Sequence, residues 1–426
     1  MRKQILRGAG VAVTALLAVA GLSACSGGSS SDTLTIWTRT DGESYMRDLA
    51  KKYESANEGL NVEVTAIPNS DVATKFAQAV SAGDVPDVMA MDVAMAPYFV
   101  SKNAFEDLTD RIAELSYADT LLEGQLDAGT SDGSNFVVPF TADASALFYN
   151  KDLFGEAGLD PEQGPQTWDE FVEAANAIGA LGGDYEGYHF SAGCGGCSAF
   201  VLAPMLWAAG GDFLDSSSGS LNPPATFDDP LTVEFIEKLQ SAVQGGGITS
   251  ASQVDGGENY GGAFENGKLG MVSSGSFQLA NFMANPLPFE LGVVPLPGKE
   301  AGENAAFTGG DVLAIPNGAP NSDAAWKFLE WASGDEAQTF LSDGGFTPVR
   351  TDLLKTVYSD KGPEFAAMAE ATTNGRVPVT VAFTSIYSDA NGPFVSLMQA
   401  GVFGEDVPAA AAAAQETAAQ IVASNE

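Results

Sequence analysis

Strand-like and helix-like segments alternate near the start of the chain, and this alternation constrains the fold more than any other feature. The expected elements are a strand over 34–38, a helix over 43–54, a strand over 61–67, a helix over 72–82 and a strand over 87–91. Strands separated by helices lie parallel in one sheet, so the pattern predicts an α/β fold. Ligands of such sheets bind at the carboxyl ends of the strands, which directs attention to residues 39–41 and to Asp92.

Length and charge narrow the possible functions. The chain has 426 residues, 45% of them hydrophobic, which is enough for two or three domains with buried cores and argues against intrinsic disorder. Its 56 acidic and 19 basic residues give a formal charge of −37. Such a surface repels phosphate backbones and anionic headgroups, so we expect no nucleic-acid partner and no electrostatic adhesion to a membrane.

The N-terminus has the features of an export signal. Basic residues precede an apolar run over residues 9–20, which is shorter than the about 20 residues of a spanning helix and ends in Leu22-Ser23-Ala24-Cys25. These four residues resemble a bacterial lipobox. The resemblance implies a signal peptide over 1–24, diacylation of Cys25, a flexible linker to residue 32 and a protein anchored by lipid to the outer face of the cell membrane. A plain secretory signal with an incidental cysteine is the alternative.

Cys194 and Cys197 form a close pair in an exported protein, which favours a short-range disulfide. Gly195 and Gly196 between them supply the backbone freedom that so small a ring needs. A thioredoxin-like redox centre would place the first cysteine at a helix N-terminus, and two glycines are a poor helix start. A zinc site would need about four ligands, whereas only His189 lies nearby. We therefore expect no metal and no other cofactor.

Further along the chain, capping residues mark helix starts. The expected starts are Thr167 with Glu170 as a capping box, Asp229 with Pro230, and Ser322. An alanine-rich segment over 408–423 predicts a C-terminal helix packed through small side chains.

One longer run carries a family resemblance. Pro139-Phe140-Thr141-Ala142-Asp143 leads into Phe148-Tyr149-Asn150-Lys151-Asp152-Leu153-Phe154, and this run resembles the extracellular solute-binding proteins of ABC sugar importers, family 1, of the maltose-binding kind. Other segments of that family follow in order: Pro86-Asp87-Val88, Thr167-Trp168-Asp169-Glu170-Phe171, Ala209-Gly210-Gly211-Asp212, Gly267-Lys268-Leu269-Gly270-Met271, Gly275-Ser276-Phe277, Gly309-Gly310-Asp311 and Pro348-Val349-Arg350.

The resemblance implies a two-lobed periplasmic-binding-protein-like fold of type II. Hinge strands would join the lobes, and the ligand would lie in the cleft between them. The first lobe would comprise residues 33–142 and 310–350, and the second residues 143–309 and 351–426. Hinge closure is a two-state equilibrium that a ligand shifts by touching both lobes. The expected partners are a carbohydrate and an ABC permease, and the protein would be a monomer.

The resemblance also implies a set of ligand-binding residues. Asp143 is the foremost, since its neighbours match the family on both sides, and Phe277 stands where relatives often stack a tryptophan on a sugar. Phe383 and Tyr387 both lie near the last aromatic contact, and the sequence does not choose between them. The expected ligand-binding residues are Asp41, Asp92, Phe140, Asp143, Phe200, Phe277, Asp311, Arg350 and Tyr387.

These residue types suit a sugar. Carboxylates accept hydrogen bonds from hydroxyl groups, and aromatic rings cover the C–H faces of a pyranose. We therefore expect capture of a di- or oligosaccharide for import, without catalysis. Two alternatives stay open: the same fold could bind a polyamine, a peptide or glycerol phosphate, and a lipid-anchored glycoside hydrolase would need only two carboxylates.

Other catalytic motifs are weak. Gly129-Thr130-Ser131-Asp132-Gly133 fits the pattern of a nucleophile elbow, but strand-like residues follow it rather than a helix, so we expect a hairpin turn. The single histidine, His189, has no recognisable catalytic partner.

Overall fold

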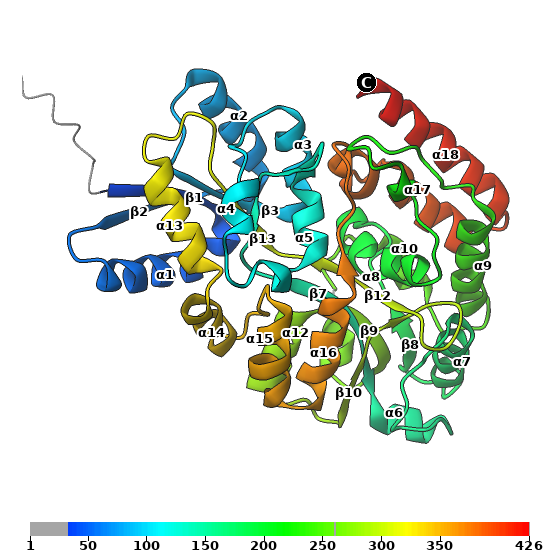
Figure 1. Ribbon diagram of the computed structural model, residues 1–426. Helices are drawn as coiled ribbons and strands as arrows, with labels where there is room; N and C mark the ends of the chain where they lie inside the picture. Colours follow the sequence, from blue (N-terminus) through cyan, green and yellow to red (C-terminus); the bar gives the residue numbers. More distant parts are fainter. Residues whose placement is uncertain (1–32, 260, 426) are drawn as a thin grey trace, which may run out of the picture. The chain divides into compact units, whose positions relative to one another are not determined.

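The computed structural model describes residues 33–259 and 261–425 (Figure 1). The signal peptide predicted over 1–24, the lipidated Cys25 and the linker to residue 32 lie outside these residues and stay predictions. In the described part of the chain, none of the helices is both long and apolar enough to cross a bilayer.

The first sheet has five strands in the order β2-β1-β3-β13-β6. Strand β1 pairs in parallel with β2 and β3, and β13 runs antiparallel to both β3 and β6. The strands are β1 (Thr33–Arg39), β2 (Asn61–Ile67), β3 (Val88–Asp92), β6 (Val138–Pro139) and β13 (Asp311–Ala314). The first three were predicted from the sequence to within one residue at either end.

Amphipathic helices cover this sheet. Helix α1 (Glu43–Ala56) buries Met46, Leu49 and Tyr53, which pack with Leu34 and Ile36 of β1 in one core cluster. Helix α2 (Val72–Ala82) follows β2 and begins and ends where the sequence predicted. Residues at alternating positions of β1 are fully buried, as expected for a strand with one face on the core.

The second sheet is built around β7 (Asp143–Asn150). Its order is β11-β12-β7-β9-β8, with β10 also paired to β7 and β14 paired to β12. The other strands are β8 (Glu186–His189), β9 (Leu269–Gly275), β10 (Leu291–Val294), β11 (Leu296–Pro297), β12 (Asn304–Gly309) and β14 (Gly375–Arg376).

Two chain segments pass side by side from one sheet to the other. One leads from β6 into β7, and the other leads from β12 into β13, with Gly309 opposite Asp143 in the register. The buried Gln125 of α5 (Glu123–Ala128) ties the two segments together, because its side-chain nitrogen donates to the carbonyl oxygens of Thr141 (3.0 Å) and Gly309 (2.7 Å). These crossings bring residues far apart in sequence to one place between the sheets.

Most of the helix starts read from the sequence are confirmed. Thr167 caps α7 (Trp168–Gly179) by accepting from the Glu170 N–H, and Asp229 caps α9 (Pro230–Gln244). The predicted C-terminal helix is α18 (Val407–Ser424), which packs on α9 and α17 at the red end of the chain in Figure 1. Ser322 is not a cap: α13 begins at Ser322 itself, whose hydroxyl donates to Glu106 instead.

The remaining α-helices are mostly short connections around the two sheets. They are α3 (Ala96–Ser101), α4 (Thr109–Ala113), α6 (Lys151–Glu156), α8 (Gly195–Ala208), α10 (Ser250–Val254), α11 (Gly262–Glu265), α12 (Ser276–Ala284), α13 (Ser322–Ala332), α14 (Asp335–Asp343), α15 (Thr351–Leu353), α16 (Pro363–Thr373) and α17 (Pro393–Leu397). The Gly129–Gly133 segment contains strand β4 (Thr130–Ser131) and the turn at Asp132 and Gly133 that leads into the antiparallel β5 (Ser134–Asn135), which confirms the predicted hairpin.

Candidate ligand-binding site

Two cavities adjoin where the chain crosses between the sheets. Both are lined by Arg39, Asp143, Phe277 and Gly310. The first, of about 480 Å³, is here named the polar chamber and is also lined by Asp41, Tyr45, Thr141, Ala142, Ser276, Ala280, Gly344, Gly345 and Phe346. The second, of about 580 Å³, is named the aromatic chamber and is also lined by Asp92, Ala94, Gly196, Cys197, Phe200, Gly257, Phe307, Gly309, Phe383 and Ser388.

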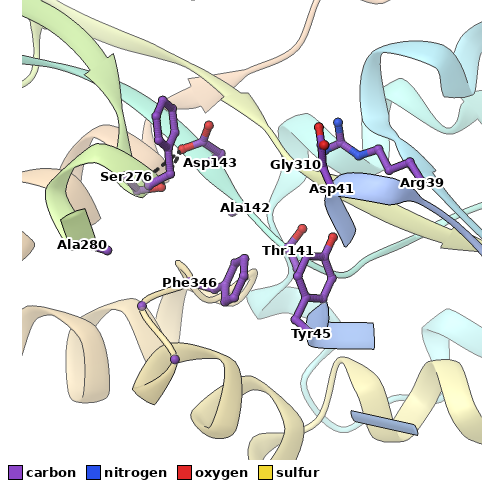
Figure 2. Close-up of a pocket in the computed structure, with 13 residues that line it drawn as sticks. Arg39, Asp41, Tyr45, Thr141, Ala142, Asp143, Ser276, Ala280, Gly310 and Phe346 are labelled. Atoms are coloured by element: carbon purple, nitrogen blue, oxygen red, sulfur yellow. Dashed lines mark hydrogen bonds between the residues drawn. The ribbon is translucent and has the colours of Figure 1, made fainter. Parts of the chain in front are cut away.

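Strand ends supply several of the charged side chains. Arg39 and Asp92 are the last residues of the parallel strands β1 and β3, and Asp41 lies in the turn after β1. Asp143 is the first residue of β7 and belongs to the other sheet. In Figure 2, Asp143 and Ser276 lie across the polar chamber from Arg39 and Asp41. A ligand in this chamber therefore meets charged groups from both sheets.

Arg39 is held by two carboxylates. Its Nε donates to Asp311 Oδ1 at 2.8 Å, and its Nη1 donates to Asp92 Oδ2 at 3.3 Å. The Tyr45 hydroxyl donates to the second oxygen of Asp311, which is completely buried. Burial disfavours the charged guanidinium, but Asp311 and Asp92 outweigh this effect and raise the pKa of Arg39. Burial raises the pKa of Asp92, and Arg39 opposes that rise.

Asp143 has a different environment, because hydrogen bonds from helix α12, and not a cation, hold its carboxylate. Its Oδ1 accepts from the Ser276 hydroxyl at 2.8 Å and from the Phe277 N–H at 3.4 Å, both in the first turn of α12. Gly275 permits this approach, since a Cβ atom there would lie 2.4 Å from Oδ1. Burial raises the pKa of Asp143 to about 6, while the Ser276 and Phe277 hydrogen bonds lower it.

Phe277 is the most exposed aromatic ring of the two chambers. It is 52% exposed and lines both of them, so its ring is available to an incoming ligand. Three other rings form a wall of the aromatic chamber: Phe307 lies between Phe200, at 5.5 Å between ring centroids, and Phe383, at 6.3 Å.

Four residues expected in the cleft lie behind the chamber walls instead. Phe140 is in the core and packs against Tyr45, and Asp311 is buried beneath Arg39. Arg350 is 4% exposed, forms ion pairs with Asp335 and Asp352 at 2.6 Å each, and stacks on Tyr117. Tyr387 is completely buried between Phe383 and Phe394. Of Phe383 and Tyr387, it is Phe383 that lines the aromatic chamber.

The structure also places chamber residues that the sequence did not single out. Tyr45, Phe307 and Phe346 are the clearest examples. Tyr45 lies in the first turn of α1, the helix that follows the carboxyl end of β1, and that position could have revealed it. Phe307 and Phe346 carry no local signal, because they reach the chambers only through the crossing of distant segments.

Cys194 and Cys197 form a disulfide at the start of α8. The expectation that Gly195 and Gly196 would not open a helix was wrong, since α8 begins at Gly195. Close packing explains why glycine occupies this helix start, since a Cβ atom at Gly195 would lie 2.1 Å from the Tyr387 carbonyl oxygen. In the described residues, no group of His, Cys, Asp and Glu side chains could hold a metal ion.

Comparisons with known proteins identify relatives of this chain. The family model of the bacterial extracellular solute-binding proteins matches residues 37–339. A binding protein of Brucella abortus is 26% identical over 340 residues, which cover 78% of this chain and 79% of that one. The multiple sugar-binding protein of Streptococcus mutans is 25% identical over 338 residues, covering 74% and 73%. The sn-glycerol-3-phosphate-binding periplasmic protein of Salmonella typhimurium is 25% identical over 357 residues, covering 78% of each.

Solved structures share the fold over nearly the whole chain. The sugar-binding protein MalE from Xanthomonas citri has a TM-score of 0.81 at 22% identity, with 92% of this chain and 98% of that one covered. The cyclic alpha-maltosyl-1,6-maltose binding protein from Arthrobacter globiformis has a TM-score of 0.78 at 25% identity, with the same coverage. The predicted fold class is confirmed: this is the α/β periplasmic-binding-protein fold with two mixed sheets. The chain belongs to the family of bacterial extracellular solute-binding proteins, which are binding components of ABC transporters and not enzymes.

Proposed function

We propose that this protein captures a di- or oligosaccharide outside the cell and delivers it to an ABC permease. The observation that carries the proposal is the exposed Phe277 ring beside the Asp143 carboxylate, at the junction of two chambers. A carboxylate accepts hydrogen bonds from sugar hydroxyls, and an aromatic ring covers the C–H face of the same sugar. This pair is the chemistry that a pyranose requires.

The two chambers favour a ligand of more than one ring. A sugar unit in the polar chamber would meet Asp41, Tyr45 and Asp143, whereas a further unit would enter the aromatic chamber. Phe277 lines both chambers, so one stacking surface would contact a chain of units that continues past Asp143. The sugar-binding relative from Streptococcus mutans supports the same substrate class.

Glycerol phosphate is the second candidate, because the Salmonella typhimurium relative binds it. The charges of the chambers disfavour an anion. Arg39 is the cation that lines them, and its Nε and Nη1 already donate to Asp311 and Asp92. Asp143 and Asp41 add negative charge, so electrostatic repulsion would weaken the binding of a phosphate but not of a neutral sugar. Family membership removes the glycoside hydrolase alternative.

Capture would involve closure of two lobes, which we assign to residues 33–142 with 310–350 and to residues 143–309 with 351–426. The adjacent crossing segments of β7 and β12 support a hinge at Asp143 and Gly309. Acylation of Cys25 would keep a monomeric binding protein near its permease, and the membrane would be contacted only through that anchor.

Thermal unfolding of the purified protein in the presence of single solutes tests the proposal. A ligand at about 100 times its Kd stabilises the folded state by about 2.7 kcal/mol. We expect at least one di- or oligosaccharide to raise the Tm, with little effect of glycerol 3-phosphate, spermidine or a tripeptide. A rise with one of those three compounds and with no saccharide would overturn the proposed substrate class.

A further inference from the structure

The Cys194–Cys197 disulfide forms part of the aromatic chamber. Cys197 and its neighbour Gly196 line this chamber, and so does Gly257 from a distant loop. Gly257 lies next to the disulfide: a Cβ atom on it would lie 3.4 Å from Cys197 Sγ and 3.6 Å from Cys194 Sγ. A side chain at this position would therefore contact both sulfur atoms, and the loop and the disulfide line the same cavity.

The Asp255 carboxylate holds this loop through hydrogen bonds. Its Oδ1 accepts from the N–H groups of Gly257 (3.0 Å) and Asn259 (3.3 Å). Its Oδ2 bonds with His189 Nε2 and the Ser191 hydroxyl, each at 2.8 Å. These contacts join the loop to the segment that precedes the disulfide, so the wall is one connected unit.

The same disulfide holds the first turn of α8. Cys194 is the N-cap residue of this helix, and Gly195 and Gly196 open it. Two glycines cost about 1 kcal/mol each in helix propensity, so this turn has little intrinsic stability. The covalent bond between Cys194 and Cys197 spans the turn, and Phe200 of the chamber wall follows one turn later. In Figure 1, α8 lies beside β12, against which it packs.

From these contacts we infer that the disulfide is a positioning element of the ligand site. It holds the α8 start, the Gly257 loop and Phe200 in the arrangement that receives the part of an oligosaccharide beyond Asp143. This inference rests on the proposed function for its ligand, but the fixed chamber wall can be measured without any ligand. Cys194 and Cys197 act on binding only by positioning the chamber wall. They take no part in the contacts that Asp143 and Phe277 make with the ligand.

The test compares the protein with its Cys194→Ser/Cys197→Ser variant. Hydrogen–deuterium exchange without ligand should be at least tenfold faster in the variant for amides within 195–200 and 255–259, with α1 and β1 unchanged. Affinities are then measured for maltose, trehalose, sucrose and maltotriose, and for glucose. The tightest oligosaccharide should lose at least tenfold in affinity, whereas glucose, which on this proposal contacts only Asp143 and Phe277, should lose less than twofold.

A control variant separates positioning from stability. Val422→Ala shortens a buried side chain of α18, away from both chambers. It measures how much affinity is lost when the Tm falls and the chamber walls are unchanged. Dithiothreitol, which reduces the disulfide to two thiols and is itself oxidised to a cyclic disulfide, should reproduce the exchange and affinity changes in the unmodified protein. It should change nothing in the double-serine variant.

Two results would overturn the inference: unchanged exchange over 195–200 and 255–259, or an equal affinity loss for glucose and the oligosaccharide. Failure of the proposed function gives a different result. If the unmodified protein binds none of the saccharides, the substrate class fails, and the exchange data still decide whether the disulfide fixes the chamber wall.

Discussion

The two chambers share Asp143 and Phe277 but are stabilised in different ways. The polar chamber is stabilised by the buried Asp311, which accepts hydrogen bonds from Arg39 and from the Tyr45 hydroxyl. Ring packing and a disulfide hold the aromatic chamber. Charged hydrogen bonds depend on direction and protonation, whereas apolar contact depends mainly on area. Under the proposed function, the polar chamber would select the ligand through its hydroxyl groups, whereas the aromatic chamber would accept further sugar units with less selectivity.

The largest expected effect comes from breaking the buried charge pair of the polar chamber. Asp311→Ala leaves Arg39 and Tyr45 without their shared acceptor, and we expect the free energy of unfolding to fall by about 3 kcal/mol. Urea denaturation measures this change. The matched control is Asp323→Ala, since Asp323 pairs with Arg111 at the surface and should cost less than about 1 kcal/mol. Equal effects of the two variants would mean that the buried pair does not stabilise the chamber.

The next effect concerns recognition. Asp143→Ala should weaken saccharide binding by about 1.5 to 3 kcal/mol, the value of a charged hydrogen bond, and leave the fold intact. Isothermal titration calorimetry and circular dichroism check both parts. Unchanged affinity would remove Asp143 from the site.

Titration of Asp143 should make binding depend on pH. Its pKa of about 6 lies above the unfolded value, so the protonated form is favoured by folding, and the stability from this group is lost as pH rises from about 4 through 6. A carboxylate accepts hydrogen bonds from sugar hydroxyls more strongly than a carboxylic acid does, so affinity should rise as the pH passes upward through about 6. Arg39 and Asp92 are the other charged groups of the aromatic chamber beside it. Calorimetry from pH 5 to 7.5 should give this rise in the unmodified protein, and Asp143→Asn should abolish it; a rise that persists in the variant would assign the titration to another group.

The smallest effect is expected for stacking. Phe277→Ala should reduce affinity by about 1 kcal/mol, and Phe277→Trp should retain or improve it because both rings cover a pyranose face. Phe340→Ala removes another partly exposed ring, located on α14, and should leave binding unchanged. If the Phe277 and Phe340 variants bind equally well, the ring at the junction of the chambers takes no part in recognition.

The sequence predicted those strands and helices whose formation depends mainly on residues close together in the chain. The alternation of strands and helices over 34–91 gave the parallel strands, and the carboxyl ends of those strands hold Arg39 and Asp92 as expected. Asp143 was identified through the family resemblance of the run that surrounds it. The strands needed only periodicity, whereas this site residue needed the resemblance to a known family.

The remaining site depends on contacts between distant segments. Arg350 was expected in the cleft, but Asp335 and Asp352 bind it on the other side of the wall. Phe383 and Tyr387 are separated by one helical turn, and only the packing of Tyr387 on Phe394 decides which of them faces the chamber. Sequence periodicity places a residue on a face of its element and does not identify the neighbour of that face.

The most direct measurement is a crystal structure of the protein with the saccharide that raises its Tm most. We predict a sugar ring stacked on Phe277, with a hydroxyl group about 2.5 to 3.0 Å from the Asp143 carboxylate. A second ring should lie beside Phe200, Phe307 and Phe383. A saccharide bound away from Asp143 and Phe277 would contradict the proposed site.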